Sequence, residues 1–126
     1  MLSNEEEISI LIDYLNKLEK FIKDEPSFNF GNKKIYDKKR VDDILCCVDS
    51  SMPSEFNKYL STFGENKEIK TFKYRRKLIE NIKIKPPIGN NSYFVNYSET
   101  LQAINFLKKC IPSDISYIRA NYPNLY

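Results

Sequence analysis

The 126-residue sequence contains no histidine and only three glycines. Histidine is the commonest general base, the commonest metal ligand and the usual partner of a catalytic serine or cysteine, so its absence argues against these sites. Three isolated glycines cannot build a glycine-rich phosphate-binding loop. They also leave few positions for a positive φ, which favours helices over a many-turned β protein. We therefore expect a predominantly helical protein that is not an enzyme and needs no cofactor.

Cysteine and long apolar runs are also scarce. Cys46 and Cys47 are adjacent, Cys110 is distant, and the odd total does not suggest a disulfide framework. Without a Cys-x-x-Cys pair, the three thiols do not supply a zinc site. The longest apolar run is far shorter than a membrane span, and no secretory segment precedes the first expected helix. We expect an intracellular, cytoplasmic protein in a reducing compartment, with no metal and no membrane contact.

A repeat about sixty residues long is the main positive feature of the chain. A pattern of tyrosine, lysine, leucine, isoleucine, lysine and proline occupies residues 14–26 and returns over residues 74–86. A second match relates residues 52–56 to residues 111–115. Two separate folds of about sixty residues would each be marginally stable, so the copies are expected to share one core.

The repeat predicts the fold class. We expect a single α+β domain over residues 1–126, predominantly helical, with one copy over about 5–62 and the other over about 66–121. Each copy would contain a helix, a short strand and two further helices. The two strands would pair antiparallel across a pseudo-twofold axis, with helices packed on one face.

In the first copy, apolar residues at spacings of three and four predict a helix over residues 5–24. Residues 27–32 are expected to form a loop anchored by Phe28 and Phe30, and residues 33–36 a short strand. Asp37 is a suitable N-cap for the next helix, and Pro53 for the first turn of a third. The expected buried positions are Ile8, Leu11, Leu15, Leu18, Ile22, Val41, Ile44, Leu45, Val48 and Met52.

The second copy repeats this order. A long helix is expected over residues 68–85, a strand over 93–95, and a helix that begins with a capping box formed by Asn96 and Glu99. Pro112 would start a separate final helix. The expected buried positions are Phe72, Leu78, Ile79, Ile82, Thr100, Ala103, Ile104, Leu107 and Ile111.

The long helix of the second copy is the candidate functional surface, because it is strongly basic. Its candidate contact residues are Lys70, Lys73, Tyr74, Arg75, Arg76, Lys77 and Lys83. Such residues can neutralise phosphates while an aromatic ring stacks on a base. The alternative is an ordinary solvated helix face. A second basic cluster lies near the first strand, and two clusters on one surface would favour nucleic-acid binding: Lys33, Lys34, Lys38, Lys39 and Arg40.

We predict a small non-enzymatic binding protein that acts by contact with another protein, and a homodimer would also fit. The alternative is a nucleic-acid-binding accessory or regulatory protein that uses the basic helix around residues 70–85. The net charge of +3 and the sequence pI of about 8.7 are modest for a dedicated nucleic-acid binder. Salt dependence of binding would separate the two hypotheses, since phosphate contacts weaken steeply with salt.

Overall fold

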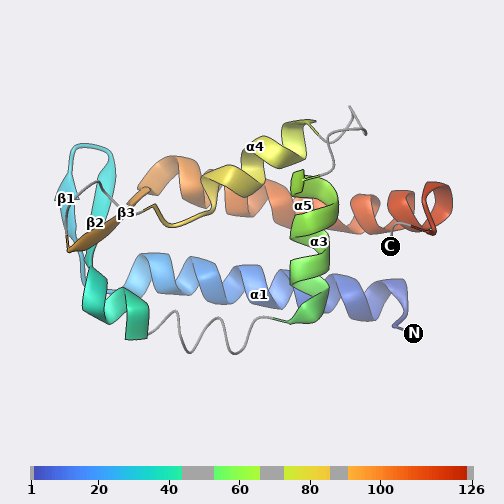
Figure 1. Ribbon diagram of the computed structural model, residues 1–126, viewed down its shortest axis with the longest axis horizontal. Helices are drawn as coiled ribbons and strands as arrows, with labels where there is room; N and C mark the ends of the chain where they lie inside the picture. Colours follow the sequence, from blue (N-terminus) through green and yellow to red (C-terminus); the bar gives the residue numbers. More distant parts are fainter. Residues whose placement is uncertain (1, 44–52, 66–72, 86–90, 125–126) are drawn as a thin grey trace.

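The computed structural model describes residues 2–43, 53–65, 73–85 and 91–124, which form a mostly helical α+β fold with a small antiparallel sheet (Figure 1). Its elements are α1 (Asn4–Asp24), β1 (Phe28–Phe30), β2 (Lys33–Asp37), α3 (Ser54–Glu65), α4 (Lys73–Asn81), β3 (Ser92–Asn96) and α5 (Tyr97–Asn121). Residues 38–43 are also helical. Among the described helices, none is both long and apolar enough to cross a membrane.

The two longest helices, α1 and α5, lie side by side and antiparallel (Figure 1). A capping box starts α1: the Ser3 hydroxyl accepts the Glu6 backbone N–H at 3.1 Å, and the Glu6 carboxylate accepts the Ser3 N–H at 3.2 Å. An ion pair of 2.7 Å between Glu19 and Lys108 joins the two helices. Arg119 of α5 donates to the Leu2 carbonyl, so the N-terminus of α1 meets the C-terminus of α5 at the end of the molecule opposite the sheet (Figure 1).

The hydrophobic core lies among four helices: α1, α3, α4 and α5. The rings of Tyr14 on α1 and Phe56 on α3 pack with their centroids 4.3 Å apart. The predicted burial is confirmed for Leu11, Leu15, Leu18, Ile22, Val41, Leu78, Ile79, Ile82, Thr100, Ala103, Ile104, Leu107 and Ile111, and Ile8 packs partly buried against them. The predictions for Ile44, Leu45, Val48, Met52 and Phe72 fall outside the described residues.

The sheet has the order β1-β2-β3, with both pairings antiparallel. The predicted pairing of the two strands is confirmed, and Ile35 lies opposite Phe94 at its centre. Tyr36 is fully buried beneath the sheet, and its hydroxyl donates to the Ile22 carbonyl at 2.7 Å. Burial raises the pKa of Tyr36 to about 12.

The prediction for residues 27–32 is wrong in two respects. These residues include a third strand, β1, which joins β2 through a two-residue loop of Gly31 and Asn32. Gly31 has a φ of 62°, the sign required at the first loop position of a type II′ hairpin turn. Phe28 and Phe30 are not anchors in the core, because 62% and 71% of their surfaces are exposed.

The expected break at Pro112 is also wrong, since α5 continues through it to Asn121. Proline removes one helical hydrogen bond, which costs about 3 kcal/mol in a helix interior. The apolar face of α5 is continuous on both sides of Pro112, with Leu107, Ile111 and Ile115 buried. We attribute the unbroken helix to the packing of this face, while the proline ring lies on the exposed side.

Two predictions for residues 66–121 are wrong, one about the end of a helix and one about a helix cap. Helix α4 ends at Asn81 instead of residue 85, because the chain leaves it to form an isolated bridge between Lys85 and Phe94 at the outer edge of β3. Asn96 precedes α5 but makes no side-chain capping bond, so the predicted capping box is absent. As the last residue of β3, Asn96 takes its direction from the strand pairing with Lys33.

The N-cap predicted at Asp37 is confirmed, since its carboxylate accepts the Lys39 backbone N–H at 2.8 Å. The internal duplication stays a prediction. Helices α1 and α4, which correspond in the repeat, have 21 and 9 residues within the described parts of the chain. The helix that follows β3 is continuous with the one expected to start at Pro112.

Candidate functional site

The structure separates the predicted basic-helix residues into three groups. Lys73, Tyr74 and Lys77 are exposed on α4. Lys83 lies beyond the end of α4 and forms an exposed ion pair with Glu80 at 3.3 Å. The partly buried arginines of this set are Arg75 and Arg76, and Lys70 lies outside the described residues. These side chains therefore differ in their exposure, and Lys73 and Lys77 lie one turn apart on the exposed part of α4.

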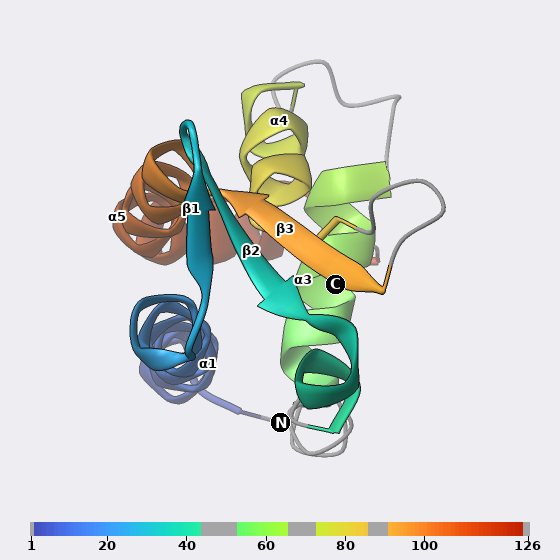
Figure 2. The same cartoon turned by 90° about the vertical axis from the view of Figure 1, so that its left-hand side faces the viewer.

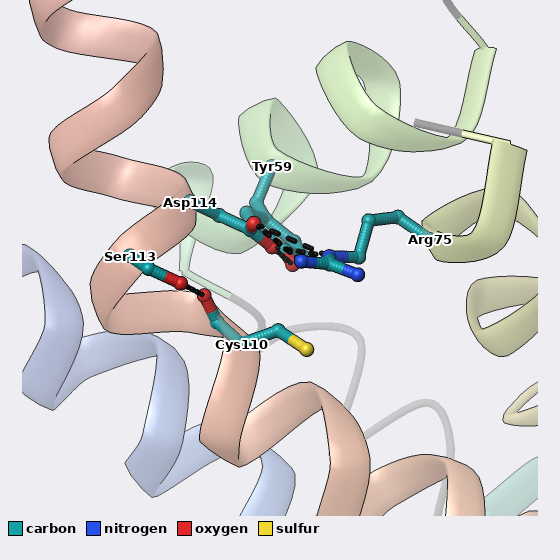
Figure 3. Close-up of polar contacts among 5 residues, drawn as sticks. All are labelled: Tyr59, Arg75, Cys110, Ser113 and Asp114. Atoms are coloured by element: carbon teal, nitrogen blue, oxygen red, sulfur yellow. Dashed lines mark hydrogen bonds and ion pairs between the residues drawn. The ribbon is translucent and has the colours of Figure 1, made fainter. Parts of the chain in front are cut away.

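Arg75 is turned inward, onto α5 (Figure 3). Its Nε donates to Asp114 Oδ2 at 2.9 Å, and its Nη2 donates to Oδ1 at 3.1 Å, which makes the contact bidentate. The buried hydroxyl of Tyr59 donates to the same Oδ2 at 2.9 Å. We call Tyr59, Arg75 and Asp114 the buried cluster. It connects α3, α4 and α5.

The electrostatics of the buried cluster fit a structural role. Burial, reinforced by the Asp114 carboxylate, raises the pKa of Tyr59. The hydrogen bonds that Arg75 donates to Asp114 likewise raise the pKa of Arg75. Burial also raises the pKa of the neighbouring Cys110 thiol, which keeps it in its unreactive protonated form. The two charged groups of the cluster are paired with each other, and the Tyr59 hydroxyl donates to the same carboxylate, so their described bonds hold three helices together.

The solvent face of the sheet has a different composition. Residues opposite one another in antiparallel strands point to the same side. Phe28 lies opposite Ile35, Ile35 opposite Phe94, and Phe94 opposite Lys85, so these four side chains form one row. Tyr36 and Val95, which alternate with them, are buried, so the row faces away from the core.

A second row on the same face contains Phe30 opposite Lys33. The Lys33 ammonium lies 4.7 Å from the centre of the Phe94 ring, within the range of a cation–π contact. We define the aromatic face as Phe28, Phe30, Lys33, Ile35, Lys85 and Phe94. Figure 2 looks onto the end of the molecule where the sheet lies across the helices.

The segments that build and flank the sheet are basic. Residues 28–43 and 82–96 carry seven lysines or arginines and three acids. Some of these charges are paired, as in the contacts of Lys38 with Asp42 at 3.0 Å and of Arg40 with Glu25 at 2.7 Å. Among the described strand residues on the same side of the sheet, the one carboxylate is that of Asp37, which caps the following helix. A positive charge surplus thus remains beside the rings.

Two cavities lie elsewhere. One, of about 450 Å³, lies near the N-termini of α1 and α3 and is lined by Leu2, Glu7, Ser54, Glu55, Lys58, Arg119 and Pro123. Its buried carboxylate, that of Glu7, is already bonded to Arg119, which also donates to Asn4 Oδ1 at 2.6 Å. The other, of about 600 Å³, is lined by Asp37, Lys38, Lys39, Asp42, Asp43 and Asn91. The buried charge that lines the first cavity is thus already paired, and the charged residues that line the second are exposed.

Within the described parts of the chain, no three metal-ligating side chains come together. No family model matches this chain, and comparisons with curated proteins and with solved structures find no match. Function must therefore be inferred from the residues of the site.

The aromatic face was missed from sequence, although one signal for it was present. A Gly-Asn pair between two segments of strand-forming residues is a hairpin signal, and Phe28 and Phe30 alternate immediately before it. Recognition of this hairpin would have placed both rings on one side of a strand. The opposition of Phe94 to Ile35 follows from the strand register and has no local signal.

Proposed function

We propose that this chain is a non-enzymatic binding protein that contacts another macromolecule through the aromatic face. The observation that carries the proposal is the exposure of Phe28 and Phe30, 62% and 71%, on the same side of the sheet as the half-buried Ile35 and Phe94. Contiguous exposed apolar side chains mark interaction surfaces in soluble proteins, whereas single ones need no explanation. Aromatic residues in addition supply a large share of binding energy at interfaces.

Among the described residues, the exposed aromatic side chains outside the sheet form no group of comparable size. Phe106 and Tyr117 are 44% and 41% exposed on α5, but they stand eleven positions apart on a helix. Tyr74 is 49% exposed on α4, beside the inward-turned Arg75. The aromatic face brings several apolar side chains together on one side of a three-stranded sheet, which makes it the better binding surface.

A photo-crosslinking experiment in cells tests the proposal. We would replace Phe30 with benzoylphenylalanine in one variant and Phe106 in a matched control, since both side chains are exposed phenylalanines. Position 30 should give defined crosslinked adducts and position 106 should not. Protease and nuclease sensitivity of the adducts identifies the partner as protein or nucleic acid. Equal labelling at both positions, or none at position 30, would reject the aromatic face as the binding surface.

The class of partner is a separate question. A protein partner would cover the rings with apolar side chains of its own, and a second copy of the chain would do so in a homodimer. A nucleic acid would stack bases on the same rings. Two cations predicted on the basic helix are less available for nucleic-acid contact, because Arg75 is bound to Asp114 and Lys83 to Glu80.

We also propose that the two halves of the chain arose by internal duplication, with a pseudo-twofold axis between β2 and β3. Ile35 and Phe94, which correspond in the repeat, pair at the centre of the two strands. Tyr36 and Val95 also correspond, and both are buried. An experimental structure in which residues 5–62 and 66–121 superimpose would support the duplication. Halves that follow different paths would refute it.

A further inference from the structure

We propose that the aromatic face binds single-stranded nucleic acid, with bases stacked on Phe28, Phe30 and Phe94. This inference rests on the proposed function and specifies its partner. Three properties of the face support it: the spacing of the rings, the position of the cations among them, and the kind of side chain that is exposed.

The spacing of the rings suits bases that are separated from one another. Phe28 and Phe30 are two residues apart on β1, so their side chains leave the strand about 7 Å apart. Phe94 lies two strands from Phe28 in the same row, about 10 Å away across the sheet. Bases within one strand of a duplex are about 3.4 Å apart, so neighbouring rings can each take a base only from an unstacked strand. Paired bases in a duplex do not expose their flat surfaces in this way.

The cations lie among the rings. Lys33 is opposite Phe30 and over the Phe94 ring, and Lys85 ends the row that contains Phe28, Ile35 and Phe94. Lysine is depleted in the cores of protein–protein interfaces, where its desolvation is costly. A phosphate backbone instead gains from such charges, because each contact releases condensed counterions. The position of Lys33 therefore favours a polyanion over a protein partner, and repulsion between like charges opposes a second copy.

The two rings that β1 contributes to the aromatic face belong to phenylalanine, which has no hydrogen-bonding group with which to select one base. It stacks on the π-face that every base presents. The expected activity is therefore binding with little sequence preference. Lys33 and Lys85, which lie among the rings, would contact the phosphates.

Fluorescence anisotropy with the purified full chain tests the inference. The probes are labelled oligouridylate and oligothymidylate of about 16 nucleotides, the upper end of the site size of one single-strand-binding fold, and a duplex of equal length. The variant F28A/F30A removes two exposed rings, and F106A is the matched control, since Lys109 lies 5.9 Å from the Phe106 ring on α5. Circular dichroism checks that each variant folds, and F30A alone replaces the double variant if that one does not.

Wild type and F106A should bind both single strands in preference to the duplex. F28A/F30A should weaken binding by about 25-fold or more, because each stacked base contributes about fivefold or more. Raising the salt from about 50 to about 200 mM should weaken binding, and K33A/K85A should reduce the logarithmic salt slope by about 1.4. Rings and charges would then contribute separately.

Three results would overturn the inference: no single-strand binding at low salt, equal binding by F28A/F30A and F106A, or equal preference for the duplex. Binding to vesicles of phosphatidylserine and phosphatidylcholine without oligonucleotide binding would assign the face to a membrane surface. A dimer in sedimentation that F28A/F30A dissociates would assign it to a second copy. Crosslinks from position 30 to protein alone, with no oligonucleotide bound, would overturn this inference but leave the proposed function intact. Absence of crosslinks would remove the proposed function.

Discussion

Arg75 and Lys33 come from the two basic clusters of the sequence, yet the fold gives them opposite surroundings. Arg75 meets the buried carboxylate of Asp114 in a bidentate contact. Lys33 remains exposed beside the rings of the aromatic face, 4.7 Å from the centre of Phe94. The first cation stabilises the packing of three helices, and the second is available to a partner. Basic residues in a sequence thus indicate a binding surface only where no distant carboxylate neutralises them.

The largest expected effect is the loss of the carboxylate in the buried cluster. D114A would leave the Arg75 guanidinium without its partner and the Tyr59 hydroxyl without its acceptor. Breaking a buried ion pair in this way costs about 3–5 kcal/mol of unfolding free energy, measured by urea denaturation. The matched control is D42A, because Asp42 pairs with Lys38 on the surface and should matter far less. Equal losses in the two variants would refute the structural role of the cluster.

The next comparison lies within the predicted basic helix. R75A would leave Asp114 bonded to Tyr59 but without its cation, at a cost of about 1–3 kcal/mol. K77A, at an exposed position on the same helix, should change the unfolding free energy by less than about 0.5 kcal/mol. If both substitutions left stability unchanged, Arg75 would be available for binding, and the basic helix would regain its place as the candidate site.

Alkaline pH should lower the free energy of unfolding because Tyr59, a member of the buried cluster, holds its proton in the folded protein. The pKa of Tyr59 is raised in the folded protein, so this tyrosine keeps its proton when the unfolded chain loses it near pH 10. Its contribution to stability is complete below about pH 10 and declines above it, by up to about 1.4 kcal/mol per pH unit. Y59F should show a correspondingly shallower decline in urea unfolding between about pH 10 and 11. A slope unchanged in Y59F would contradict the protonated hydroxyl bonded to Asp114.

Apart from the matched controls, the smallest effect on stability is expected at the aromatic face. F28A/F30A removes two rings that are mostly exposed, so the free energy of unfolding should change by less than about 1 kcal/mol. Urea unfolding of F28A/F30A and D114A therefore compares the unfolding free energy lost at an exposed surface with that lost at the buried cluster. A loss of several kcal/mol in F28A/F30A would mean that the rings are part of the core.

The sequence predicted those parts of the fold that depend on local periodicity. The apolar faces of α1 and α5 follow from residues three and four positions apart, and the antiparallel pairing of β2 with β3 was expected for the two short extended segments. The rule for proline failed at Pro112, because packing on both sides outweighed the lost hydrogen bond. For Arg75, no local pattern could show that its partner lies 39 positions away on another helix. The sequence therefore indicated α4 as the binding surface, whereas the contacts of the folded chain favour the sheet.

Backbone amide shifts of the labelled chain during titration with oligouridylate test the account most directly. The perturbed residues should lie in β1, β2, β3 and at Lys85, and the amides of α4 and of the exposed side of α5 should keep their shifts. Perturbations centred on Lys73 and Lys77 of α4, with the strands unchanged, would contradict it.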